Sequence, residues 1–242
     1  MVGERFDLPE DPRLAPKYVR VVDSGAAAPV VLVGVVHDHP ASVYRARTVV
    51  DAVAPGAVAL ELPDALVDLF ATYAERGDGV GGEMAAAVDA AGDATVVGID
   101  APNPGSLRAL AAEARAADAS PRDVARTVRE FGRLAAETAR GWLAAAGVPG
   151  EWVDGVPGGA QTFDCSAGDA PADQAAHEAA HVRRSTSLLR SFEVPAAARL
   201  LDAARERYMA ERLAALGGQS AVVAVVGYSH LDAVADALAG EE

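Results

Sequence analysis

The segment Val30–His37, with the sequence VVLVGVVH, is a run of mostly β-branched residues that ends in a Gly-x-x-His turn. A second segment, Ala221–His230 with the sequence AVVAVVGYSH, repeats this arrangement near the other end of the chain. Strands that are apolar on both faces are typical of a parallel sheet covered by helices on both sides. A helical pattern follows each segment, so we expect both to be central strands of an α/β sheet.

Three further apolar runs complete the expected sheet. Tyr18–Val22 is separated from the first segment by Ser24-Gly25 and is predicted to pair with it as a hairpin. Val58–Leu62 and Thr95–Ile99 lie between helical patterns that end at glycine or proline. The sequence therefore predicts one α/β domain over residues 1–242, with a central, mostly parallel sheet of about five strands flanked by helices.

The middle of the chain, residues 105–216, is predicted to be a mainly helical segment between the fourth and the last strand. Ser120-Pro121 is a helix start, since serine can cap and proline fits the first turn. Two more helices are expected over residues 172–192 and 196–216. Gly150–Pro171 is rich in Gly, Pro and Asp and is predicted to be a flexible loop or lid.

Composition excludes several classes of function. A net charge of −14 without a basic stripe argues against nucleic-acid binding. No apolar run reaches the roughly 18 residues of a membrane span, and the first ten residues do not form a signal peptide, so we expect a cytoplasmic protein. An acidic chain with Lys17 as its only lysine suits a salt-rich cytoplasm, with a GC-rich genome as the alternative explanation. The single cysteine, Cys165, is interpreted as structural or incidental.

Polar side chains close four of the apolar strands: His37, Glu61, Asp100 and His230. In open α/β sheets, ligands bind beyond the carboxyl ends of the strands, so these side chains are candidates for one site. A carboxylate at the end of an apolar strand requires a partner, because burying an unpaired charge is costly. For Glu61 that partner is either the site itself or an arginine such as Arg205.

Five motifs in this order resemble the TraB/PrgY family. They cover residues 30–239. They are the opening, in which a Gly-x-x-His turn is followed by a strand that ends in Glu61, the element Gly82-Glu83-Met84, the strand end Ile99-Asp100, the helix segment Ala204–Ala210 and the closing Val-Gly-x-x-His turn. The chain departs from the family pattern where Val35 replaces a threonine, Ala101 an arginine and Ser229 a glycine.

The resemblance implies a site shared with Tiki-type metalloproteases, erythromycin-esterase-like hydrolases and a haem-binding protein. Its catalytic side chains would be His37, Glu61, Glu83, Arg205 and His230, with Asp100 and Arg108 binding substrate. In the Tiki-like form, His37, His230 and Glu61 would hold a divalent metal (Mn, Co or Zn) that activates water for hydrolysis of peptide or ester bonds. In the esterase-like form a histidine is the general base and no metal is required.

Two alternatives stay open. The same site in a non-catalytic protein would capture a peptide or another small ligand. Residues 177–181 spell His-Glu-x-x-His on a predicted helix, with His177 and His181 on one face as in zinc proteases, but no third ligand follows. The expected partner is therefore a peptide or small molecule, and a homodimer is an open alternative.

Overall fold

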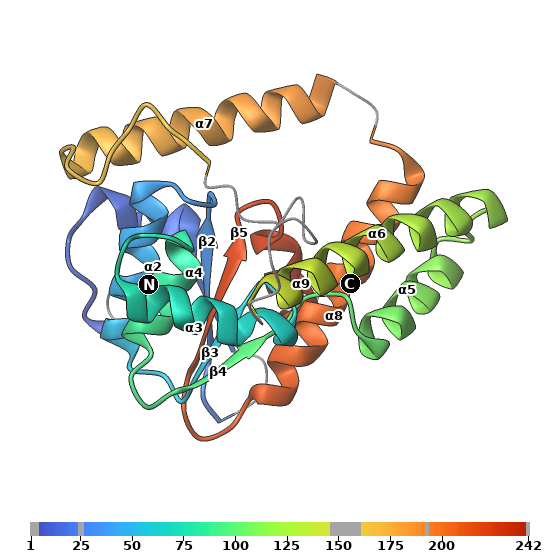
Figure 1. Cartoon of the computed structure of the whole chain (residues 1–242), viewed down its shortest axis with the longest axis horizontal. Helices are drawn as coiled ribbons and strands as arrows, with labels where there is room; N and C mark the ends of the chain where they lie inside the picture. The colour runs from blue at the N-terminus through green and yellow to red at the C-terminus, as the bar shows by residue number, and fades with distance from the viewer. Residues whose placement is uncertain (1–4, 24–26, 146–160, 192–193, 241–242) are drawn as a thin grey trace.

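The computed structural model describes residues 5–23, 27–145, 161–191 and 194–240. It contains a five-stranded sheet with the order β1-β2-β5-β3-β4 (Figure 1). Its four neighbouring strands β2, β5, β3 and β4 are parallel, and β1 pairs antiparallel with β2 at one edge. The predicted α/β fold and hairpin are confirmed. The strands are β1 (Val19–Val22), β2 (Val30–Val35), β3 (Ala57–Leu60), β4 (Thr95–Gly98) and β5 (Val222–Gly227).

Helices connect and cover these strands. In chain order the helices are η1 (Pro12–Leu14), η2 (Pro16–Tyr18), α2 (Pro40–Val53), η3 (Asp64–Leu66), α3 (Val67–Arg76), α4 (Gly82–Ala90), α5 (Pro104–Ala116), α6 (Pro121–Ala145), α7 (Pro171–Ser191), α8 (Ala196–Leu216) and α9 (Leu231–Ala239). No helix among the described residues is long and apolar enough to cross a membrane.

Helices cover both faces of the sheet. Because successive side chains of a strand point to opposite faces, the side chains on both sides of each central strand are buried. In β5, Val223 and Val225 pack with α2 and α4, whereas Val222 and Ala224 pack with α8 and α9. Every residue of β2, β3 and β5 is buried. This double burial explains why these strands are continuous apolar runs rather than alternating ones.

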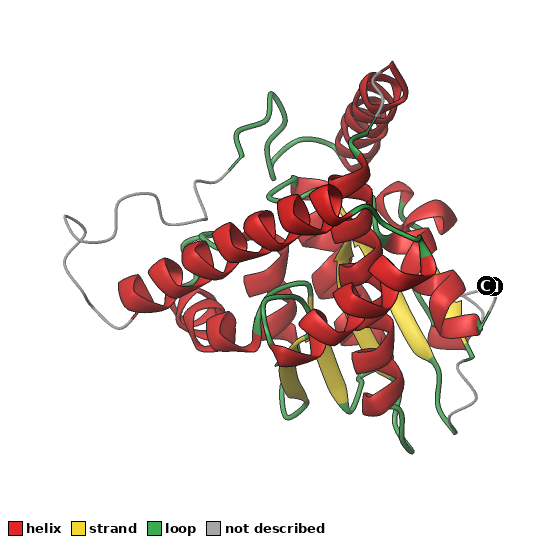
Figure 2. Cartoon of the chain, turned by 90° about the vertical axis from the view of Figure 1, so that its right-hand side faces the viewer, coloured by secondary structure: helices red, strands yellow, loops and turns green. Residues whose placement is uncertain are grey.

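In Figure 1, helices α5, α6 and α8 of the mainly helical segment 105–216 lie to the right of the sheet, and α7 lies at the top. Helix α5 and helix α6 pack on α8, whereas α7 packs against α2 and η1. In Figure 1, α7 runs along the end of the molecule toward which β2 and β5 point, and Figure 2 shows it nearly end-on. Of the predicted loop 150–171, residues 150–160 lie outside the described residues, and residues 161–170 form neither helix nor strand.

Candidate functional site

The strand order places the four polar strand ends side by side. Because β2, β5, β3 and β4 are parallel neighbours in register, their carboxyl ends meet at one edge of the sheet. Val35 pairs with Gly227, and Leu60 pairs with both Val225 and Gly98. The side chains that follow these strands therefore form a row in the order His37, His230, Glu61 and Asp100.

Gly227 is the point at which the two histidine turns meet. Its N–H donates a short hydrogen bond to Glu61 Oε2. A methyl group on its Cα would lie 3.2 Å from that oxygen and 3.7 Å from both His37 Nε2 and His230 Cδ2. Glycine at this position thus lets two imidazoles and a carboxylate approach the same point above the sheet.

A buried carboxylate orients His37. Glu83, in the first turn of α4, accepts a hydrogen bond at 2.7 Å from His37 Nδ1 and another at 2.9 Å from the N–H of Asp38. The hydrogen bond with Glu83 and the negative charges of Glu83 and Glu61 raise the pKa of His37 to about 9, against the opposing effect of burial. Half of the His37 side chain is exposed, and its Nε2, on the opposite side of the ring from Glu83, lies near Gly227. A raised pKa makes this nitrogen a proton donor at neutral pH.

A second carboxylate orients His230 in the same way. Glu206 of α8 lies 2.7 Å from His230 Nδ1, and His230 Nε2 lies 3.6 Å from Glu61 Oε1. Burial lowers the pKa of His230, but the Glu206 hydrogen bond and the Glu61 charge outweigh it, so the pKa is raised. Sequence reasoning did not single out Glu206. The one feature of the sequence that could have indicated a role for Glu206 is its position next to Arg205, in the helix segment Ala204–Ala210 that resembles the family.

Arg205 joins the two remaining carboxylates of the row. It donates to Glu61 Oε1 at 2.9 Å and to the two oxygens of Asp100 at 3.0 and 2.6 Å. Both carboxylate side chains are nearly buried, so Arg205 is the partner that the burial of Glu61 required. The third guanidinium nitrogen, Nη1, lies 3.5 Å from His230 Nε2. The Arg205 cation therefore contacts His230 as well as the two carboxylates.

A cavity of about 350 Å³ opens beside this row. Its polar floor includes His37, Glu61, Glu83 and Asp100, and its walls are largely apolar side chains from η3, α3, α4 and α6, among them Leu66, Leu69, Phe70, Met84 and Leu134. A polar floor under apolar walls is the usual composition of a small-molecule pocket. Arg108, in contrast, is exposed on α5 and does not line this cavity.

The His-Glu-x-x-His element of α7 lies in a different environment. Glu178 is fully buried, where it forms an ion pair with Arg45 and accepts a hydrogen bond from the Ser42 hydroxyl. His177 contacts His39, and His181 lies edge-on to the ring of Phe163. A zinc protease needs this glutamate beside the metal as a general base, so the surroundings of Glu178 argue against that alternative.

We call the row of strand ends that carries His37, His230, Glu61 and Asp100 the rim. Its candidate metal ligands lie farther apart than the ligands of a closed metal site. Among the described residues, one group of three His, Cys, Asp or Glu side chains has its ligand atoms within 4.8 Å of one another, and it is His39, Cys165 and His177. His37 and Glu61 line the cavity, and His230 lies beside Glu61, with 3.6 Å between His230 Nε2 and Glu61 Oε1, outside the cavity lining. Imidazoles oriented by carboxylates suit general acid and base chemistry. Comparisons of the chain with protein-family models, with curated proteins and with solved structures found no match.

Proposed function

We propose that this chain is a TraB/PrgY-like hydrolase that cleaves an ester or peptide bond at the rim cavity. One observation carries the proposal: the pairs Glu83–His37 and Glu206–His230 present their Nε2 sides around Gly227 and Glu61, at the floor of the cavity and beside it. A carboxylate that holds the far nitrogen of an imidazole fixes its tautomer and orientation. Two such pairs offer an acid and a base on either side of one reacting group.

The two histidines would have different tasks. His37, with its pKa near 9, is an imidazolium at neutral pH and can donate from Nε2 to the carbonyl oxygen on which charge develops. The raised pKa of His230 favours its charged form, so it can act as a base only in the fraction that is neutral, in which Nε2 accepts a proton from water while Glu206 holds Nδ1. Arg205 would act as a positioning residue that holds Glu61 and Asp100 in place.

A divalent metal is the alternative form of the same proposal. The donor types fit, because two imidazoles and the Glu61 carboxylate lie close together and each imidazole has a carboxylate on its Nδ1, but their ligand atoms are not gathered within 4.8 Å of one another. A bound Mn, Co or Zn ion would polarise the carbonyl and lower the pKa of a bound water.

Two features of the chain oppose a cation there. His37 would first have to release a proton held with a pKa near 9, and Arg205 already neutralises Glu61. We therefore favour hydrolysis by the histidine pairs, with the metal form as the alternative.

The walls of the cavity indicate the substrate. Leucine, phenylalanine and methionine side chains surround a floor of charged groups, so the pocket suits a molecule with an apolar group next to the bond that is cleaved. An acyl chain of moderate length or an apolar amino-acid side chain has this character. A strongly anionic substrate is disfavoured, because Asp38 and Glu137 also line the cavity, and the carboxylates there outnumber the two cations, His37 and Arg205, that pair with Glu61, Glu83 and Asp100.

The test is hydrolysis of a series of nitrophenyl esters with acyl chains of increasing length, and of short peptides with apolar residues. We expect activity that peaks at an intermediate chain length and falls at least a hundredfold in His37→Ala and in His230→Ala. Arg108→Ala serves as the control and should retain full activity. Activity that survives both histidine substitutions would contradict the proposal. Loss of activity with a chelator, and its return with Mn²⁺, Co²⁺ or Zn²⁺, would select the metal form.

Binding without turnover is the second candidate function, and the apolar walls support it equally well. It predicts that a short-chain ester or its acid binds to the wild-type protein with a measurable heat, without any product, and that Leu69→Asp abolishes this binding. Product formation by the purified protein excludes this second candidate.

A further inference from the structure

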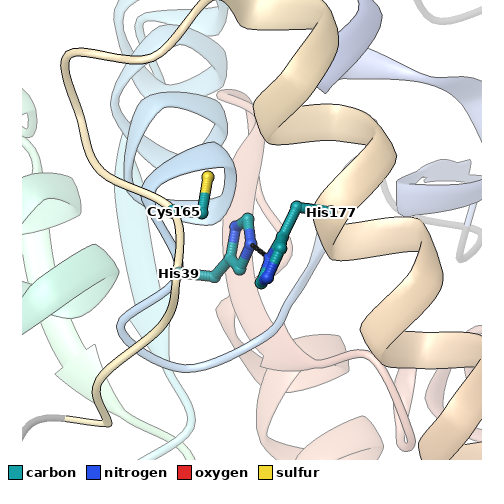
Figure 3. Close-up of side chains that lie close together, drawn as sticks. All are labelled: His39, Cys165 and His177. Carbon is teal, nitrogen blue, oxygen red and sulfur yellow. Dashed lines mark hydrogen bonds between the residues drawn. The ribbon is translucent and has the colours of Figure 1, made fainter.

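Three side chains gather outside the rim cavity, on the other side of the β2–α2 turn. They are His39, Cys165 and His177, and one ligand atom from each lies within 4.8 Å of the others. Figure 3 shows the three side chains together, with the hydrogen bond of 3.0 Å between His39 Nε2 and His177 Nδ1. They come from three different segments: the residue that precedes α2, the segment that precedes α7, and α7 itself.

The two histidines are held in place by the surrounding structure. His39 is fully buried, and its Nδ1 accepts a hydrogen bond at 3.1 Å from the N–H of Ala41, as the cap of α2. His177 precedes Glu178, whose buried ion pair with Arg45 fixes α7 against α2. Neither imidazole therefore needs to move far to reach a common ligand, and such preorganisation favours tight binding.

The segment that carries Cys165 is also held. The buried side chain of Gln174 donates to the carbonyl oxygens of Ser166 and Asp169 at 3.1 and 2.9 Å. The N–H of Ser166 in turn donates to Asp169 Oδ2 at 2.8 Å. These bonds define the backbone directly after Cys165, whose thiol lies within 4.8 Å of the histidine ligand atoms. Burial and the neighbouring Asp169 carboxylate raise the pKa of the thiol, so a metal would have to displace its proton.

The chemistry of the three groups matches a soft or borderline divalent metal. Zinc takes cysteine sulfur and histidine nitrogen in its structural and catalytic sites, and three protein ligands leave one position for water. Because His39 Nδ1 accepts from Ala41, the proton between the histidines belongs to His39 Nε2 and is donated to His177 Nδ1. For a metal to bind His39 Nε2 of a neutral imidazole, the His39 proton would move to Nδ1, which gives up the hydrogen bond from the Ala41 N–H, and the Cys165 thiol would lose its proton to solvent.

We propose that His39, Cys165 and His177 bind Zn²⁺, and that the ion joins α7 and the segment before it to the start of α2. This second site is independent of the rim hydrolase. It lies beside the rim, because His39 is two residues from His37 and the N–H of Gln161 donates to Asp38 Oδ2 at 2.9 Å. Since Gln161 also lines the rim cavity, zinc binding would stabilise one border of that cavity.

Cobalt titration of the reduced, metal-free protein tests the proposal, because only this site contains a thiol. We expect one equivalent of Co²⁺ to produce a thiolate-to-cobalt charge-transfer band, and one equivalent of Zn²⁺ to abolish it. Cys165→Ser should lack the band, and His177→Gln should weaken Co²⁺ binding at least tenfold. The double variant H37A/H230A is the matched control and should keep the full band, since a metal at the rim would have no sulfur ligand.

Two results would overturn the proposal: wild-type protein that binds no Co²⁺, and bound Co²⁺ that has no thiolate band and is lost in H37A/H230A. The second result would instead support the metal form of the rim site. Circular dichroism of Cys165→Ser and His177→Gln shows whether each variant folds. If Cys165→Ser does not fold, Cys165→Ala replaces it. We expect added Zn²⁺ to raise the melting temperature of the wild type and to leave that of either folded variant unchanged.

Discussion

Glu83 Oε1 lies 2.7 Å from His37 Nδ1, and Glu83 is almost completely buried while half of the His37 side chain is exposed. This pair connects the start of α4 with the end of β2. It makes His37 a cation whose Nε2 is on the side of the rim cavity. The proposed roles, His37 as proton donor and His230 as base, depend on that charge.

Glu83→Gln removes the charge that holds the proton on His37. We expect the pKa of His37 to fall from about 9 toward the ordinary value of about 6.5, since the hydrogen bond with Glu83 is the main cause of the increase. An NMR titration of the imidazole measures this change. Glu206→Gln is the control and should leave the titration of His37 unchanged. A His37 that still titrates near pH 9 in Glu83→Gln would show that another group is responsible.

The same pair makes stability depend on pH. A pKa that is raised in the folded state stabilises the fold below the unfolded pKa of about 6.5, and this contribution disappears as the pH rises through about 9. We therefore expect the free energy of unfolding of the wild type, relative to His37→Gln, to decline between pH 6.5 and 9. Urea denaturation across this range gives the difference. Because His37 is half exposed, solvent screening will keep the effect small.

Arg205→Met should destabilise the fold by about 3 kcal/mol, because it leaves the nearly buried carboxylates of Glu61 and Asp100 without a positive partner. Arg108→Met is the matched control: Arg108 is exposed, and its loss should change stability by less than about 0.5 kcal/mol. Chemical denaturation of both variants measures the contrast. Equal effects would mean that the Arg205 cluster contributes little to the fold.

Gly227→Ala tests the site at the point where its groups meet. The added methyl would lie 3.2 Å from Glu61 Oε2 and 3.7 Å from His37 Nε2, so it would fill the space in which a reacting group must bind. We expect at least a tenfold loss of esterase activity with a near-normal melting temperature. Gly218→Ala, where an added Cβ meets only one atom at 4.0 Å, should retain activity. Full activity of Gly227→Ala would place the reaction elsewhere.

Glu178→Gln separates a structural from a catalytic role for the His-Glu-x-x-His element. We expect a loss of about 3–5 kcal/mol in stability, because the fully buried Arg45 would lose its only carboxylate partner among the described residues. Glu113→Gln, which breaks a partly exposed pair with Arg207, should cost less than about 1 kcal/mol. A stable Glu178→Gln protein that has lost proteolytic activity would revive the zinc-protease alternative.

Much of the fold could be predicted because a strand that is buried on both faces consists almost entirely of apolar residues, which can be recognised in the sequence. The fully apolar runs ending at His37 and His230 became the neighbouring central strands β2 and β5, and the helix predicted over residues 196–216 has these bounds in the structure. Boundaries set by local turns were less accurate. The strand expected over Val58–Leu62 spans Ala57–Leu60 in the structure, and the strand expected over Thr95–Ile99 ends at Gly98.

The partners of the site residues were harder to predict. Glu206 was not singled out, and the contact of His39 with His177 was not predicted, because polar residues in or next to a helix have no distinctive pattern and their roles follow from contacts with distant segments. Arg108 was assigned to the site by resemblance alone, and it lies on the exposed face of α5.

By itself, the sequence determined that the chain forms a parallel sheet with polar groups at four strand ends, since strand period and burial are local properties of the chain. Only the tertiary structure decided which groups are paired: Glu83 with His37, Glu206 with His230, and Glu178 with Arg45. The physical reason is that the energy of a buried charge depends on what lies within a few ångströms of it, and these partners are separated by 24 to 133 positions in the chain.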